Sequence, residues 1–520
     1  MRALLLLALF VLSGLNFAGP VVEGDYFWHL RQGQRHLQEG RVPLEFPTQW
    51  LGQVLLYGWW KLSGYGGMVL LRALGYTAIL GLLWGWMRRK GVPFFWAFLT
   101  VFLSAGLLKE FPSERPQLLS FLLLPPFLGL LEAARAGRAW AFLALPAVLL
   151  LWGNVHAGAL IGAAALLLYA LAEGLLALQG RGSFLKAALM ALAALAPFGV
   201  LFALLPQALG ALWGILGGML SYSLYQRSVL EYLSPLEAAL GLGHWHPAYW
   251  ALLGLTGVAL LRGARRGMPL HHVLLALAFL ALSLRAVRFM PLLSFLLPLT
   301  APWSAPRASD WHRSGRLLGL FASVLLVWAL LSPPAPRLKI SEEFPSKAVQ
   351  FLKAQRPLGR VFNYYGWAGY LAWELPRWEF FMPVQDIGAD VSSAYQGIIW
   401  GSQEPLMGRP RWQALLRAYG LEAVLMPGLS PISGELYPLL GHLVRSPQWS
   451  LVYSDQVANL FVRAPVARGA GLKALDKRLA YRQVRQQAER MLRQGGLSRK
   501  VRQTLQKALR ELNGDAVQPL

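Results

Sequence analysis

Long apolar runs recur through the first 333 residues, and they constrain the fold more than any other feature of the sequence. A bilayer-spanning helix needs about 20 mostly apolar residues. Only 14% of the chain is charged, against roughly 25% in soluble domains. The sequence therefore predicts an α-helical polytopic membrane protein with about eleven transmembrane helices. The predicted spans cover residues 3–18, 67–87, 93–109, 117–132, 139–153, 158–178, 185–204, 248–262, 269–284, 290–302 and 316–332.

The basic cluster Arg88-Arg89-Lys90 gives this bundle a direction, because positive loops stay on the cytoplasmic side. We interpret the first apolar run as a retained helix, with a signal peptide as the alternative. The loop at 20–65, with short helices on the membrane surface, and the long amphipathic loop at 205–247 then lie outside. We expect a multi-pass protein of the plasma membrane whose active site is extracytoplasmic.

Composition changes after the Pro-rich stretch at 333–337. We expect three parts: a bundle over 1–333, a small extracytoplasmic α/β or α+β domain over 338–465, and a basic helical tail over 466–520. In the domain, GRVFNYYGWAGYLAWEL and LEAVLMP are predicted as strands with turns, and residues 405–419 as a helix. Positive loops and the tail explain the net charge of +24 without nucleic acid. The chain has no cysteine, which excludes disulfides and thiolate metal sites.

Several polar residues lie at the predicted outer ends of the spans. Glu23 and Asp25 are in the first outer loop, and His29 shares a helical face with Asp25. A carboxylate there can serve as a general base or a metal ligand, or it is simply a solvated loop acid. His156 is a ligand or a hydrogen-bonded packing residue. Glu231 is a site residue or a charge on an amphipathic face.

Cations at outer helix ends are not explained by the positive-inside rule. Glu114 and Arg115 are adjacent, so they form either a surface ion pair or part of an anion site. Arg285 and Arg288 follow the ninth span. They either extend to lipid headgroups or bind an anionic partner, for which a lipid phosphate is the natural candidate.

Five segments in the same order carry a resemblance to a known family. They are GDYFWHLRQGQRHLQEGRVP, KEFPSERPQLLSF, LLWGNVHAGALIG, SLRAVRFMPLL and GRVFNYYGWAGYLAWEL. Over most of the first 375 residues the chain resembles bacterial multi-span proteins related to the GT-C glycosyltransferases. The resemblance implies a sugar donor carried on polyprenyl phosphate or diphosphate and transfer at the outer face of the membrane.

The resemblance also implies roles for particular residues. Asp25 matches the catalytic acid of the first outer loop, and Glu114 matches a second acid in a later loop. Arg115, Arg285 and Arg288 match the arginines that bind the donor phosphate. Asp25 and Glu114 together are the candidate ligands of a divalent cation, Mg or Mn, which some members of the family use.

Two departures from the family pattern leave the acceptor open. The first loop has Glu23-Gly-Asp25 where many members have adjacent acids, and GWAGYLAW is similar to the WWDYG motif of oligosaccharyltransferases but lacks its acid. The leading hypothesis is transfer of a sugar from a polyprenyl-phosphate donor to an envelope glycan, lipid or protein. The alternatives are a transporter or flippase of lipid-linked sugar and a non-catalytic envelope assembly protein.

Overall fold

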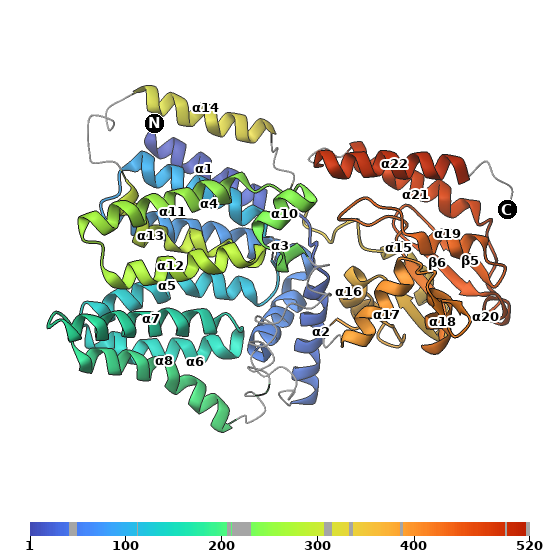
Figure 1. Ribbon diagram of the computed structural model, residues 1–520, viewed down its shortest axis with the longest axis horizontal. Helices are drawn as coiled ribbons and strands as arrows, with labels where there is room; N and C mark the ends of the chain where they lie inside the picture. Colours follow the sequence, from blue (N-terminus) through green and yellow to red (C-terminus); the bar gives the residue numbers. More distant parts are fainter. Residues whose placement is uncertain are drawn as a thin grey trace.

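The computed structural model describes residues 1–40, 49–111, 113–204, 210, 230–305, 315–331, 336–384, 388–493 and 497–515. In Figure 1 the apolar helices run side by side through one half of the molecule, and the strands and C-terminal helices form the other half. Helix α2 lies between the two halves and crosses the direction of the bundle helices. Most of the predicted loop at 205–247 lies outside the described residues.

The helices of the bundle follow the apolar runs. Within the described residues, α3, α5 and α7 are long and apolar enough to cross a membrane, and seven further apolar helices are shorter. The apolar helices indicate a membrane protein, while the number of eleven spans stays a prediction. The helices are α1 (Arg2–Phe17), α2 (Gly24–Glu39), α3 (Trp50–Arg89), α4 (Phe94–Lys109), α5 (Gln117–Arg135), α6 (Ala139–Val155), α7 (Ala159–Leu178), α8 (Phe184–Leu204), α10 (Pro235–Leu242), α11 (Pro247–Arg266), α12 (Leu270–Arg285), α13 (Leu292–Ser304) and α14 (Gly315–Leu331).

Helix α3 joins the predicted surface helix to the second predicted span. The two segments meet at Gly64, whose φ of 62° and ψ of −165° are not helical. Glycine adopts a positive φ without the steric cost of a Cβ, so the chain bends there. The first segment carries Trp59 and Trp60, and the second is the apolar run.

A four-stranded mixed sheet forms the centre of the other half, with strand order β1-β4-β6-β5. β1 and β4 are parallel, and the other neighbours are antiparallel. The strands are β1 (Arg360–Asn363), β4 (Leu421–Met426), β5 (Trp449–Ser454) and β6 (Asn459–Arg463), with a small hairpin of β2 (Pro405–Leu406) and β3 (Arg409–Pro410). The helices are α15 (Ser346–Lys353), α16 (Ala368–Glu374), α17 (Ala389–Ile399), α18 (Arg411–Ala418), α19 (Pro438–Arg445), α20 (Ala464–Gly469), α21 (Arg478–Arg493) and α22 (Arg499–Asp515).

Two local predictions in this half were wrong. The strand expected across GWAGYLAWEL is a short 3₁₀ turn followed by α16. The helix expected over 405–419 begins only at Arg411, because the β2–β3 hairpin precedes it. The basic C-terminal helices pack their apolar faces, including Val484 and Leu505, into the same core as one side of the sheet.

The two halves are joined through α2 and α16, and small residues allow that contact. A Cβ on Gly369 would lie 2.1 Å from the carbonyl oxygen of Gly24, and one on Gly24 would lie 2.6 Å from the oxygen of Gly366. The Phe27 ring makes edge-to-face contacts with the rings of Phe344 and Tyr370, at distances of 5.1 and 4.9 Å between ring centres. The start of α2 is therefore positioned by the half of the molecule that contains the sheet.

Candidate functional site

Arg115 is the centre of a cluster of carboxylates between the two halves. Its Nη1 donates to Asp25 Oδ2 at 2.9 Å, and its Nε lies 3.0 Å from Glu23 Oε2. Its Nη2 donates to Glu23 Oε1 at 3.1 Å and lies 3.5 Å from Glu231 Oε2. One guanidinium therefore holds three acidic side chains that come from distant parts of the sequence.

The backbone around the cluster brings these residues together. Asp25 is in the first turn of α2, and Arg115 lies two residues before α5. Glu231 and Arg288 belong to two short 3₁₀ helices, which are tied by a hydrogen bond from the Val287 amide to the Leu233 carbonyl at 2.8 Å. The Arg288 guanidinium carbon lies 5.0 Å from the centre of the Tyr232 ring, a cation–π geometry.

Two cavities meet at this cluster. The smaller, of about 380 Å³, extends between the bundle helices past Ser120, Leu124, Trp152 and Ile161. The larger, of about 800 Å³, extends towards the half of the molecule that contains the sheet. Asp25, Arg115, Gln117, Glu231 and Arg288 line both cavities. The charged cluster is therefore where ligands in the two cavities would come into contact.

Burial affects the acids of the cluster differently. Burial, partly offset by Arg115, raises the pKa of Glu23 to about 7. Burial likewise raises the pKa of Asp25, against the opposing effects of Arg115 and Arg288. For Glu231 the desolvation is outweighed by Arg115 and Arg288, and its pKa is lowered. The cluster thus holds one carboxylate whose pKa is lowered and two whose pKa values are raised, so that these two accept protons more readily than usual.

His156 is a neutral hydrogen-bonding group at the wall of the smaller cavity. Its Nδ1 lies 2.7 Å from Ser120 Oγ and accepts the Gly158 amide at 2.9 Å. Trp152 Nε1 donates to the same Ser120 oxygen at 2.7 Å, which directs the serine proton to His156. Burial, with Arg288 and Arg115 nearby, lowers the pKa of His156 to about 3. A neutral imidazole with Nδ1 as acceptor carries its proton on Nε2.

Seven of the nine residues proposed from the sequence line these cavities. Asp25, His29, Arg115, His156, Glu231 and Arg288 line the smaller cavity, and Glu23 lines the larger one. Arg285 lines neither cavity as described, although it is only three residues from Arg288.

Glu114 is also separate from the cavities. It is fully buried and pairs with Arg72 of α3, which is itself 1% exposed. The proposed cation ligands Asp25 and Glu114 are therefore bound to different arginines. Among the residues that the structure describes, no group of three or more His, Asp or Glu side chains is arranged to hold a metal ion. The described donor set does not fit a divalent cation.

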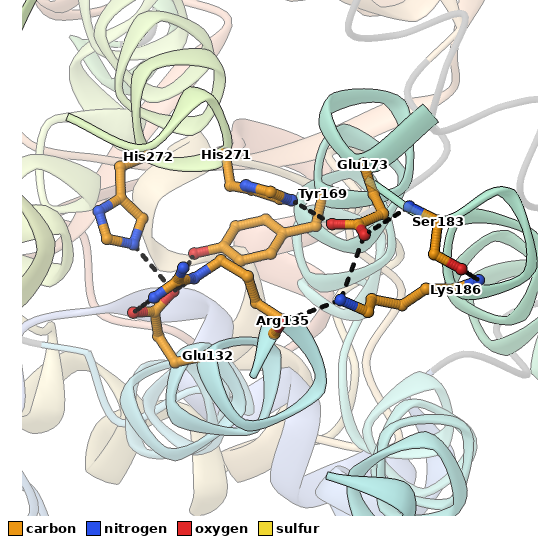
Figure 2. Close-up of polar contacts among 8 residues, drawn as sticks. All are labelled: Glu132, Arg135, Tyr169, Glu173, Ser183, Lys186, His271 and His272. Atoms are coloured by element: carbon orange, nitrogen blue, oxygen red, sulfur yellow. Dashed lines mark hydrogen bonds and ion pairs between the residues drawn. The ribbon is translucent and has the colours of Figure 1, made fainter. Parts of the chain in front are cut away.

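The sequence did not predict a second polar cluster, which is shown in Figure 2. It lies near the C-terminal ends of α5 and α7, whose N-terminal ends are near the carboxylate cluster. Glu132 of α5 contacts His272 at 2.8 Å and Tyr169 at 3.1 Å. Glu173 of α7 contacts Lys186 at 3.2 Å and His271 at 3.3 Å. Acidic residues within apolar helices are costly unless paired, and that cost was the available signal. The cluster connects the ends of α5, α7, α8 and α12.

The comparisons with known proteins bear on the fold. The sequence matches no protein-family model and no curated protein. Its structure is similar to the apo oligosaccharyltransferase of Archaeoglobus fulgidus, with a TM-score of 0.52 and 10% identity over 81% of this chain and 69% of that chain. It is also similar to the mycobacterial arabinofuranosyltransferase AftD, with a TM-score of 0.46 and 17% identity over 89% of this chain and 41% of that chain.

The first of these likenesses bears on the fold alone. The chain has the fold of the GT-C membrane glycosyltransferases, and the resemblance seen in the sequence is confirmed at the level of the fold. The particular reaction depends on this chain's own site.

Proposed function

We propose that this protein is a glycosyltransferase that moves a sugar from a polyprenyl-phosphate-linked donor to an acceptor on the outer face of the plasma membrane. The observation that carries the proposal is the meeting of two cavities at Asp25, Arg115 and Arg288. One cavity between bundle helices suits a lipid-linked donor, and the other suits an acceptor. The cluster between the two cavities contains a general base, Asp25, and two cations, Arg115 and Arg288.

The chemistry assigns a step to each of these groups. An acceptor oxygen attacks the anomeric carbon, the bond from that carbon to the donor phosphate breaks, and polyprenyl phosphate leaves with the electron pair. The acceptor proton passes to Asp25, whose Oδ2 is held by Arg115. Arg288 and Arg115 stabilise the charge that develops on the leaving phosphate.

The placement of the site supports an outer-face reaction. In α5 and α7 the end near the site is the N-terminal end, and the cluster of Figure 2 is at the other end. Lys90 contacts Glu132 of that cluster at 2.9 Å. The positive-inside rule assigns Lys90 to the cytoplasmic side, which supports a carboxylate site at the opposite face.

The same geometry weakens the two alternatives. A transporter places its ionisable residues near the bilayer midplane, whereas the charged residues of both described cavities lie at helix ends and in the connecting segments. A non-catalytic assembly protein has no need for a base between two arginines in a cavity. Transfer explains the arrangement more fully than either alternative.

Arg288 and Arg285 provide the test of the proposal, because only Arg288 lines the cavities. The full-length protein in nanodiscs is given radiolabelled polyprenyl-phosphate sugars and an envelope fraction of its own cell, and transfer of label is measured. Arg288→Gln should lower kcat/KM by roughly 10- to 100-fold, the value of a lost hydrogen bond to a charged group. Arg285→Gln should remain close to wild type. Equal rates in the two variants, or no transfer by the wild type from any donor, contradict the proposal.

The α2–α16 contact predicts that a methyl group added at Gly369, in the lining of the larger cavity, impairs the reaction. In Gly369→Ala the new Cβ meets the Gly24 backbone, one residue before Asp25. Backbone cannot yield as a flexible side chain does, so α2 must shift. A displacement near 1 Å costs roughly 10²-fold in rate. The matched control is Gly469→Ala, whose Cβ meets nothing within 4 Å. Transfer rates and thermal midpoints are measured for both variants. A wild-type rate in Gly369→Ala argues against this positioning.

A further inference from the structure

The larger cavity has two chemically different walls. Its charged lining residues all come from the part of the chain before residue 290, and they are Glu23, Asp25, Glu110, Arg115, Glu231 and Arg288. The described residues that line it from Tyr364 to Tyr437 are all uncharged. The second group is here called the outer wall. A charged ligand group would find no countercharge among the described residues of the outer wall.

Aromatic rings and short polar side chains make up much of the outer wall. Trp400 is 40% exposed, and its ring centre lies 5.2 Å from that of Tyr437. The Tyr437 ring lies 6.3 Å from that of Tyr364. Ser430 and Ser433 supply hydroxyl groups nearby. This is a surface of aromatic faces interspersed with groups that both donate and accept hydrogen bonds.

Hydrogen bonds hold this surface in place before any ligand arrives. The Trp400 indole donates to Gln396 Oε1 at 3.0 Å. The Tyr365 amide donates to the Tyr395 hydroxyl at 3.2 Å, and the Tyr364 amide donates to the Leu425 carbonyl at 3.1 Å. A preformed wall loses little entropy when it binds a ligand.

We propose that the outer wall binds the acceptor as an uncharged carbohydrate, so that a sugar hydroxyl faces Asp25. This inference rests on the proposed function and names its acceptor class. The C–H face of a sugar ring packs on an aromatic ring, whose negative face attracts the slightly positive hydrogens. The sugar hydroxyls exchange hydrogen bonds with the tyrosine and serine hydroxyls.

The other acceptor classes fit this wall less well. An extended peptide is usually bound by pairing with a strand edge, and none of the described residues lining the cavity belongs to a strand. A lipid acceptor needs a mostly aliphatic surface, whereas tyrosine, serine and glutamine side chains interrupt this one. An anionic polymer would find no cation to pair with among the described residues of the outer wall.

Saturation-transfer NMR on the full-length protein in nanodiscs tests the inference without requiring catalysis. The probes are maltohexaose, mannohexaose and arabinohexaose as neutral glycans, hexagalacturonate as an anionic glycan, and an uncharged hexapeptide. At least one neutral glycan should receive saturation at its ring C–H protons. Trp400→Ala should weaken that binding by about tenfold, which corresponds to roughly 1.4 kcal/mol, and Trp400→Phe should weaken it less. Trp245→Ala is the matched control, because Trp245 is 58% exposed and lies outside both cavities.

The outcomes separate this inference from the proposed function. Binding only of hexagalacturonate or the hexapeptide, no binding of any probe, or neutral-glycan binding that Trp400→Ala leaves unchanged overturns the acceptor class. Transfer to a peptide or lipid in the radiolabel assay overturns it as well but leaves the transferase proposal standing. Trp400-dependent glycan binding without transfer from any donor removes the transferase and leaves the carbohydrate site.

Discussion

Asp25→Asn is expected to lower kcat for sugar transfer by roughly 10²- to 10⁴-fold, the usual loss when a general base is removed. Asparagine nearly preserves the volume of aspartate and still accepts a hydrogen bond from Arg115 at its oxygen, so α2 should remain in place. It cannot accept the acceptor proton. The loss should therefore appear in kcat with little change in the thermal midpoint.

The pH dependence adds a second test of this assignment. A base must be deprotonated to act, so wild-type activity is lost as pH falls through the pKa of Asp25. Burial raises that pKa, and the acid limb should lie above the range of an ordinary aspartate. Asp390→Asn is the matched control, because Asp390 is exposed and lies outside both cavities. Full activity in Asp25→Asn would show that another group accepts the proton.

Neighbouring positions show what the sequence could predict and where it failed. Glu114 and Arg115 are adjacent in a non-helical segment, where successive side chains point in different directions. Arg115 faces the cavities, while Glu114 faces Arg72. The sequence indicated that the loop was charged at the outer face. Which of the two residues faces inward depends on packing against α3, which no local pattern encodes.

Arg285 and Arg288 were grouped because both follow the ninth predicted span at its outer end. The chain leaves the helix between them: α12 ends at Arg285, and Ala286 is extended with φ −155° and ψ 145°. Arg288 then belongs to a separate 3₁₀ helix that packs beside the 3₁₀ helix of Glu231. The apolar runs predicted the class of fold, because a bilayer imposes one structure on them. The irregular segments carry the site, and tertiary contacts determine their conformation.

The two polar clusters place requirements on the same helices. At the start of α12, His272 contacts Glu132 and His271 contacts Glu173. The chain that follows the other end of α12 carries Arg288, which lines the cavities. Rigid helices transmit the position of one end to the other. The cluster of Figure 2 therefore helps to fix the position of the helices on which the proposed site is built.

Arg72→Met is expected to destabilise the fold by about 3–5 kcal/mol, because it leaves a buried carboxylate without its partner. Arg72 and Glu114 are 1% and 0% exposed. Arg72 also donates to the carbonyl of Phe17 at 2.9 Å and to that of Gly19, so it ties the end of α1 to α3. The free energy of unfolding is measured by detergent titration in mixed micelles. Arg35→Met, which breaks an exposed pair with Glu39, should change it little.

The double variant Arg72→Met/Glu114→Leu distinguishes a structural role of Glu114 from the catalytic role that the family resemblance implies. Removing both charges of a buried pair is often close to neutral, so the double variant should recover much of the stability that Arg72→Met loses. If it is as unstable as Arg72→Met, the ion pair is not the cause. If Glu114 is structural, the folded double variant also keeps a substantial rate of transfer. A stable double variant whose kcat falls as far as that of Asp25→Asn would instead return Glu114 to the chemistry, even though it lies outside the described cavities.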